Sequence, residues 1–115
     1  MEAVKRGEVW LSNLNPSKGT QPGKIRPVVI LQTDLLNETH SSTIVLPITS
    51  QITKGIEHLR MHLKPSKGNG LEKDSDVLID QLVALDNKRL IQRLGKVTNS
   101  ELDIIVANVA IVLDL

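Results

Sequence analysis

The chain has 115 residues, long enough for one domain with a sizeable core, and contains one Trp but no Tyr or Phe. The absence of Cys excludes disulfides and thiolate metal sites and fits a reducing cytoplasm. The net charge is +1, but residues 1–71 sum to +4 (nine Lys/Arg, five Asp/Glu) and residues 72–115 to −3 (five and eight). This asymmetry is compatible with a phosphate-binding face and equally with ordinary solvated charges.

The first half of the chain predicts short β-strands. Residues 7–14 form the first, and a turn follows. Residues 26–33, "RPVVILQT", are a nearly continuous apolar run, which suits a strand buried on both faces. Residues 34–39 predict a single helical turn, and residues 43–49 predict the next strand. Pro47 in that strand removes a backbone donor, so we expect an edge or a bulge there.

The second half continues this pattern and then changes period. Residues 57–63 alternate polar and apolar side chains, and residues 76–85 read as one further strand. Residues 89–97 predict a last strand or a helical turn running into one. The sequence indicates a mostly β protein with a C-terminal α-helix, folded as a small, curved antiparallel barrel in a single domain, 1–115.

The C-terminal segment predicts the helix. Thr98 and Glu101 form a candidate capping box at its start. Ile104 and Ile111 lie outside the main apolar stripe, so the helix is either deeply buried or helps to bury a partner. The apolar run at 104–113 is too short to span a bilayer, and no membrane association is expected. The stripe itself has helical spacing and comprises Leu102, Ile105, Val106, Val109, Val112 and Leu113.

Arg26 is the first candidate for chemistry, because it stands at the mouth of an apolar strand. Its guanidinium is permanently charged and offers five donors suited to phosphate. Pro27 restricts residue 26 to extended geometry, and the preceding loop, with Gly19 and Gly23, can approach a ligand closely. The alternative is an arginine that merely extends to solvent at a strand end.

Two pairs of polar residues also lie at the edges of apolar strands, as Arg26 does. Thr49 and Ser50 follow Pro47, and their hydroxyls could bind a phosphate oxygen or cap a turn. Asp80 and Gln81 interrupt an apolar run, where the Asp either needs a partner or faces solvent. His58 and His62 would lie about 13 Å apart on a strand, so they cannot share a metal ion.

The order of these motifs resembles the MazF/PemK family of bacterial toxin endoribonucleases. The resemblance runs through "KRGEVWLSNLNP", "RPVVILQTD", "STIVLPITSQI", "LIDQLVALDNKRL" and the final "VLDL". It implies the plasmid-toxin type of barrel, a homodimer, and a cognate antitoxin with a disordered acidic C-terminal segment. It also implies cleavage of single-stranded RNA at a short sequence, without metal or other cofactor, leaving a 2′,3′-cyclic phosphate and a 5′-hydroxyl.

Carried onto this sequence, the resemblance makes Arg26 and Thr49 the catalytic pair. No histidine aligns with a motif position, so no general base is assigned. Many relatives have an acidic residue where this chain has Gln21, and a Gly where it has Lys24. Lys24 could therefore add a phosphate contact. The expected RNA-binding residues are Thr20, Gln21, Lys24, Ser50, Lys54, Asp80 and Gln81.

Two other functions are considered. A gyrase-poisoning toxin of the CcdB type shares the fold but acts through a Trp near its C-terminus. Here the single Trp is residue 10, where we expect a core position, and this disfavours that function. A catalytically inactive family member that binds only RNA or antitoxin is the second, and the presence of Arg26 and Thr49 counts against it.

Overall fold

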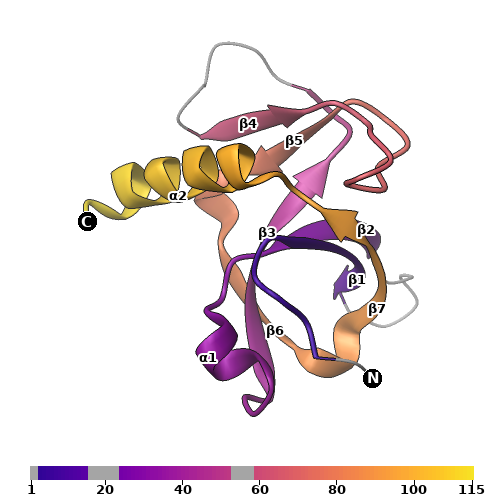
Figure 1. Cartoon of the computed structure of the whole chain (residues 1–115), viewed down its shortest axis with the longest axis vertical. Helices are drawn as coiled ribbons and strands as arrows, with labels where there is room; N and C mark the ends of the chain where they lie inside the picture. The colour runs from indigo at the N-terminus through magenta and orange to yellow at the C-terminus, as the bar shows by residue number, and fades with distance from the viewer. Residues whose placement is uncertain (1–2, 16–23, 53–58) are drawn as a thin grey trace.

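The structure is a computed structural model that describes residues 3–15, 24–52 and 59–115. These residues form seven strands, two α-helices and two short 3₁₀ turns (Figure 1). The strands are β1 (Glu8–Asn15), β2 (Lys24–Ile30), β3 (Ser42–Thr49), β4 (Arg60–Leu63), β5 (Ser75–Leu78), β6 (Val83–Asp86) and β7 (Leu90–Lys96). The helices are α1 (Asp34–Asn37) and α2 (Asn99–Leu113), and the turns are η1 (Ile79–Gln81) and η2 (Asn87–Arg89).

The strands make one curved sheet in which every paired neighbour is antiparallel. Its order is β4-β5-β3-β2-β1-β7, with β6 also paired to β3. The sheet curls on itself without closing, and α2 lies across it near β3 and β5 (Figure 1). The predicted mostly β fold with a C-terminal helix is therefore confirmed.

The second half of β2, Val28–Ile30, is buried on both faces, as its apolar sequence predicts, whereas Lys24 and Ile25 at its start are exposed. Val29 packs into a cluster with Leu46, Ile48 and Ile105, which joins the sheet to α2. Its neighbours Val28 and Ile30 point the other way, because successive side chains alternate across a strand. They join a second cluster that also contains Val4, Trp10, Val45, Leu85 and Leu90, so the prediction of a core position for Trp10 is confirmed.

Pro47 lies in β3, an interior strand with neighbours on both sides, so of the two predicted alternatives, an edge or a bulge, the edge strand is wrong. β3 pairs with β2 along one side, where Val28 faces Pro47. Along the other side β3 pairs first with β6, through residues 42–45, and then with β5, through residues 48 and 49. Pro47 falls between these two partners, at a point where no ladder pair with either of them is formed.

Residues 76–85 are not one strand, which corrects the sequence prediction. Val77 faces Ile48 and Val83 faces Val45, so six steps along this segment match only three steps along β3. The three residues of η1 account for the difference. Asp80 and Gln81 leave the ladder there and become exposed. The sequence pattern alone could not reveal this, because the three residues of η1 are preceded and followed by apolar residues, as within one continuous strand.

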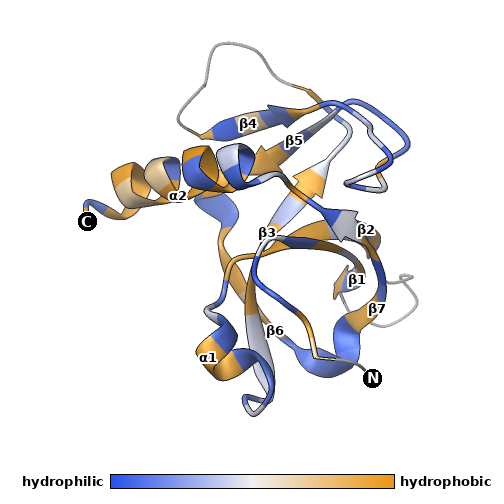
Figure 2. Ribbon diagram, in the orientation of Figure 1, coloured by the Kyte–Doolittle hydropathy of each residue, from blue (hydrophilic) through white to orange (hydrophobic). Residues whose placement is uncertain are grey.

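α2 begins as predicted. The Thr98 hydroxyl accepts from the Glu101 N–H, and the Glu101 side chain accepts from the Thr98 N–H. Ile105 and Val109 are buried against the sheet, whereas Ile104 and Ile111 are 50% and 56% exposed. Figure 2 shows apolar residues over much of this helix. The alternative of a deeply buried helix is thus excluded. No helix in the described parts of the chain is long and apolar enough to cross a membrane.

Candidate functional site

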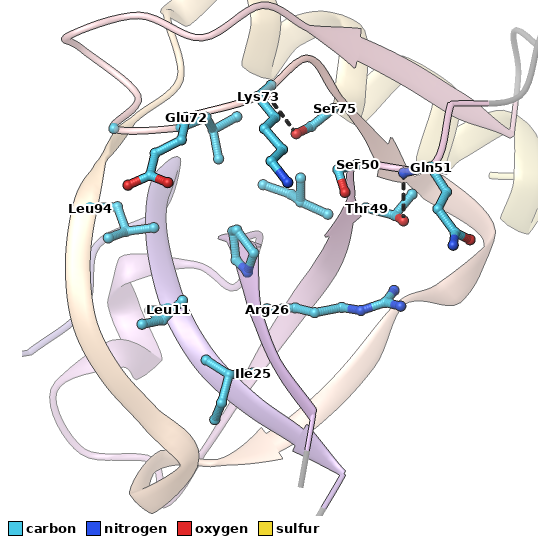
Figure 3. A pocket seen from close by; sticks show the side chains of 14 residues that line it. Leu11, Ile25, Arg26, Thr49, Ser50, Gln51, Glu72, Lys73, Ser75 and Leu94 are labelled. Carbon is cyan, nitrogen blue, oxygen red and sulfur yellow. Dashed lines mark hydrogen bonds between the residues drawn. The ribbon is translucent and has the colours of Figure 1, made fainter.

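Arg26 and Thr49 line the same cavity, which has a volume of about 540 Å³ and is called here the main cavity (Figure 3). The pairing of β2 with β3 explains why they meet. Val28 faces Pro47, so two residues back along β2 and two residues on along β3 bring Arg26 opposite Thr49. Positions two apart point to the same face of a strand, and both side chains therefore reach one side of the sheet.

The backbone of Arg26 is fixed by β1. Ser12 lies opposite Arg26 in the β1–β2 ladder, and the buried Ser12 hydroxyl donates to the Arg26 carbonyl at 3.0 Å. The side chain is half-buried and extends below Thr49 in the view of Figure 3. Within residues 3–15, 24–52 and 59–115 its guanidinium has no hydrogen-bond or ion-pair partner. No described residue therefore occupies its five donors, and they are available to bind an anion.

Thr49 is the last residue of β3 and is only 7% exposed. Its Oγ1 accepts a hydrogen bond from the Gln51 N–H at 3.2 Å, so the hydroxyl does cap a turn, as one alternative predicted. A hydroxyl that accepts can still donate its own hydrogen. Among the described residues that hydrogen has no acceptor. Ser50, exposed beside it, also lines the main cavity.

The opposite wall of the main cavity comes from residues 70–75, which the sequence prediction missed. Lys73 extends from this segment into the cavity, and Glu72 lies on the wall away from Arg26 (Figure 3). Gly70 adopts a φ of +70°, and a Cβ there would collide with the Leu94 backbone. A glycine is therefore needed for this segment to approach β7 closely. The sequence signal was the charged pair Glu72–Lys73 directly after a glycine-rich turn.

A second cavity of about 320 Å³, called here the side cavity, also includes Arg26 in its lining. Lys24 and Gln81 lie in it, together with Pro47 and Val83. Two predicted RNA-binding residues are thus brought next to Arg26. Asp80 is exposed and lines neither of these cavities, which agrees with its solvent-facing alternative. Thr20, Gln21 and Lys54 lie outside the described residues.

The site can bind an anion, because it combines cationic side chains with the hydroxyl donors of Thr49 and Ser50. Arg26 and Lys73 supply positive charge to the main cavity, and Lys24 supplies it to the side cavity. Such a set suits the non-bridging oxygens of a phosphodiester. Across the described ranges, no group of three His, Cys, Asp or Glu side chains is arranged to hold a metal ion.

Comparison with known proteins gives one family and many similar folds. Residues 5–113 match the sequence model of a family described as the PemK-like, MazF-like toxin of type II toxin–antitoxin systems. Among solved structures, MazF from Deinococcus radiodurans superposes with a TM-score of 0.80 at 22% identity, covering 100% of both chains. A MazE–MazF structure from the same organism gives 0.84 at 20% identity, covering 100% of this chain and 99% of that chain.

A third similar structure is an endoribonuclease in complex with its cognate antitoxin from a mycobacterial species. Its TM-score is 0.79 at 21% identity, and the match covers 98% of this chain and 97% of that chain. At such identities the likeness shows a shared fold. The three matches extend over nearly the whole length of both chains in each pair.

Proposed function

Because this chain belongs to the PemK-like, MazF-like toxin family of type II toxin–antitoxin systems, we propose that it is a metal-independent endoribonuclease. Residues 1–115 act as one toxin domain that cleaves single-stranded RNA at a short sequence. The products carry a 2′,3′-cyclic phosphate and a 5′-hydroxyl. The observation that supports this most strongly is the meeting of Arg26 and Thr49 at one cavity.

In the proposed reaction the ribose 2′-oxygen attacks the adjacent phosphorus and loses its proton. The bond from phosphorus to the 5′-oxygen breaks, and the 5′-oxygen takes up a proton as it leaves. Negative charge builds on the two non-bridging oxygens during this exchange. Arg26 stabilises that charge through its guanidinium, and Thr49 donates its hydroxyl hydrogen to one of the oxygens. Arg26 cannot remove the 2′-proton, because a guanidinium offers only donors and has no acceptor atom.

The two cavities suit the nucleotides on either side of the scissile phosphate, because Arg26 belongs to both. Lys73 and Ser50 would contact the strand in the main cavity. Lys24 and Gln81 would contact it in the side cavity. Holding the strand so that the 2′-oxygen lies in line with the leaving oxygen supplies a further large share of the acceleration. Thr20, Gln21, Lys54 and Asp80 are proposed as additional RNA contacts around these cavities.

The proposed assembly is a cytoplasmic homodimer that a cognate antitoxin neutralises. The exposed apolar side of α2, with Ile104 and Ile111, supports burial of this helix against another chain. The similar structures of an endoribonuclease with its cognate antitoxin and of MazE–MazF support an antitoxin partner. A disordered acidic segment of the antitoxin would suit the cationic residues Arg26, Lys73 and Lys24.

The test is incubation of the purified protein with a long, unstructured RNA in EDTA, followed by sequencing of the ends. We expect cuts at one recurrent short motif with 5′-hydroxyl ends, and no cuts by Arg26→Ala. No cutting of a sequence-diverse RNA by the wild-type protein would contradict the proposal. That result would favour either a protein that only binds RNA or antitoxin, or a gyrase-type poison. A DNA-gyrase supercoiling assay distinguishes these two alternatives, because only the poison would inhibit gyrase.

A further inference from the structure

The turn that follows Thr49 is restrained through both backbone groups of one residue, the N–H and the carbonyl of Gln51. The Gln51 N–H donates to the Thr49 Oγ1 at 3.2 Å. The Gln51 carbonyl accepts from the Arg60 guanidinium, with Nη1 at 2.7 Å. Ladder pairing between β3 and β5 stops at Thr49, so these two bonds restrain the turn where the sheet no longer does.

Arg60 is itself held by a buried carboxylate. Its Nη1 lies 3.4 Å from Asp76 Oδ2, and the Asp76 side chain is 4% exposed against 23% for Arg60. Asp76 also faces His62 across the β4–β5 ladder, with Nδ1 to Oδ1 at 3.4 Å. A carboxylate removed from water costs free energy unless charged or polar groups surround it. Its burial therefore fixes the place of the Arg60 side chain.

These contacts return to Thr49. Asp76 is the ladder partner of Thr49 on β5, so the chain of contacts runs from Thr49 through Gln51, Arg60 and Asp76 back to Thr49. Arg60 is not part of the lining of the main cavity. Its guanidinium instead binds the backbone that shapes the rim of that cavity, and a charged donor makes a shorter and stronger bond to a carbonyl than a neutral one does.

We propose that Arg60, backed by Asp76, is a positioning residue: it clamps the Thr49–Gln51 turn and so fixes the direction of the Thr49 hydroxyl. The catalytic part of this inference rests on the proposed ribonuclease function. The clamp acts through Thr49 and touches neither the RNA nor the reacting phosphate. Loss of the clamp therefore lowers the rate of the chemical step more than it weakens RNA binding, to which the turn contributes only through Ser50.

The test is a double-mutant cycle between Arg60→Ala and Thr49→Val, with kcat and KM measured on one RNA. We expect Arg60→Ala to lower kcat roughly ten- to hundredfold with a much smaller change in KM, since small misplacements have costs of this size. Arg60→Lys should recover part of the loss. In the Thr49→Val background, Arg60→Ala should cause no further loss, because its effect passes through the missing hydroxyl. The clamp would be overturned if the double variant lost kcat by the product of the two single losses. It would also be overturned if Arg60→Ala raised KM and left kcat unchanged.

Two further measurements separate the clamp from general stability and from the proposed function. Arg93→Ala is the matched control, because Arg93 also pairs with a carboxylate, Glu8, at 2.6 Å but does not line the main cavity. It should keep wild-type kcat. If Arg60→Ala folds poorly because Asp76 is left without its guanidinium, Arg60→Ala/Asp76→Asn removes both charges and should show the same fall in kcat.

The last measurement does not depend on activity. We expect the NMR order parameter of the Gln51 amide to fall from the rigid range, about 0.85, toward about 0.6 in Arg60→Ala. An unchanged order parameter would overturn the clamp whatever the activity. If the wild-type protein cleaves no RNA, the proposed function fails, and the Gln51 order parameter alone then decides whether the clamp exists.

Discussion

Arg26 and Thr49 occupy opposing positions in the continuation of the β2–β3 register, and their side chains line one cavity of about 540 Å³. The sheet thus brings a permanent cation next to a buried hydroxyl. The two side chains come from different strands, and each strand is held on its other side, β2 by β1 and β3 by β5. A site carried by strands of one sheet keeps its geometry better than one carried by loops.

Replacement of Arg26 should remove activity without affecting the fold. We expect Arg26→Ala to lower kcat roughly 10²–10³-fold, the usual effect of losing one donor to a developing oxyanion. The melting temperature should change little, because the guanidinium has no partner among the described residues. Arg26→Lys should restore only part of the rate, since it keeps the charge but loses the planar fork. Full activity of Arg26→Ala would exclude this residue from catalysis.

The Thr49 hydroxyl can be tested by a pair of substitutions. Thr49→Val keeps the shape of the side chain and removes the donor, so we expect kcat to fall about 10²-fold. Thr49→Ser keeps the hydroxyl and should retain most of the activity. Because the hydroxyl also accepts from the Gln51 N–H, Thr49→Val should in addition lower stability by about 1 kcal/mol. Equal activities of the Val and Ser variants would contradict the assigned role.

Lys73 should contribute to RNA binding. We expect Lys73→Met to weaken binding of a non-cleavable single-stranded RNA and to reduce the slope of log affinity against log salt by about 0.7, the effect of one lost phosphate contact. Lys67→Met is the control, because Lys67 is exposed and does not line the main cavity. The same slope for the Lys73 variant and the wild-type protein would place Lys73 outside the RNA path.

Gly70 should be the sensitive glycine of its segment. Gly70→Ala is expected to lower the free energy of unfolding by more than about 1 kcal/mol, because the residue has a positive φ and its Cβ would meet the Leu94 backbone. Gly68→Ala is the matched control, since its Cβ would meet only the Ser66 Oγ at 3.7 Å. Urea unfolding of both variants checks this, and equal stabilities would contradict the close approach of residues 70 and 94.

Asp34 should make stability depend on pH in the acidic range. The Arg6 N–H and the Asn37 side chain donate to this carboxylate and hold its pKa below the ordinary value of 3.8. A carboxyl whose pKa is lowered in the folded state stabilises the protein above its ordinary pKa and loses that effect as the pH falls through the lowered value. Asp34→Asn should therefore be less stable than the wild type at pH 7. In urea unfolding the difference should shrink below about pH 4.

Much of the fold could be predicted from local patterns. The apolar run of β2, the capping box of α2 and the helical turn of α1 each carry their own signal within a few residues. Arg26 and Thr49 could also be named, because each is a polar residue at the edge of an apolar strand.

The remaining features depend on contacts between distant segments. The η1 turn exists because β5 and β6 must both pair with β3, and neither strand alone shows this. Lys73 and Glu72 enter the site because Gly70 lets their segment approach β7. The pairing of Arg60 with Asp76 follows from the β4–β5 register, which only the folded sheet defines.

The most direct test of the central claim is cleavage of a matched pair of RNA oligonucleotides in EDTA. One has natural ribose throughout, and the other carries a single 2′-O-methyl group on the nucleotide before the scissile bond. The proposed mechanism predicts cleavage of the first to a 2′,3′-cyclic phosphate and a 5′-hydroxyl, and no cleavage of the second at that bond. Cleavage of both at the same bond, or cleavage only when a divalent metal is added, would contradict attack by the 2′-oxygen at Arg26 and Thr49.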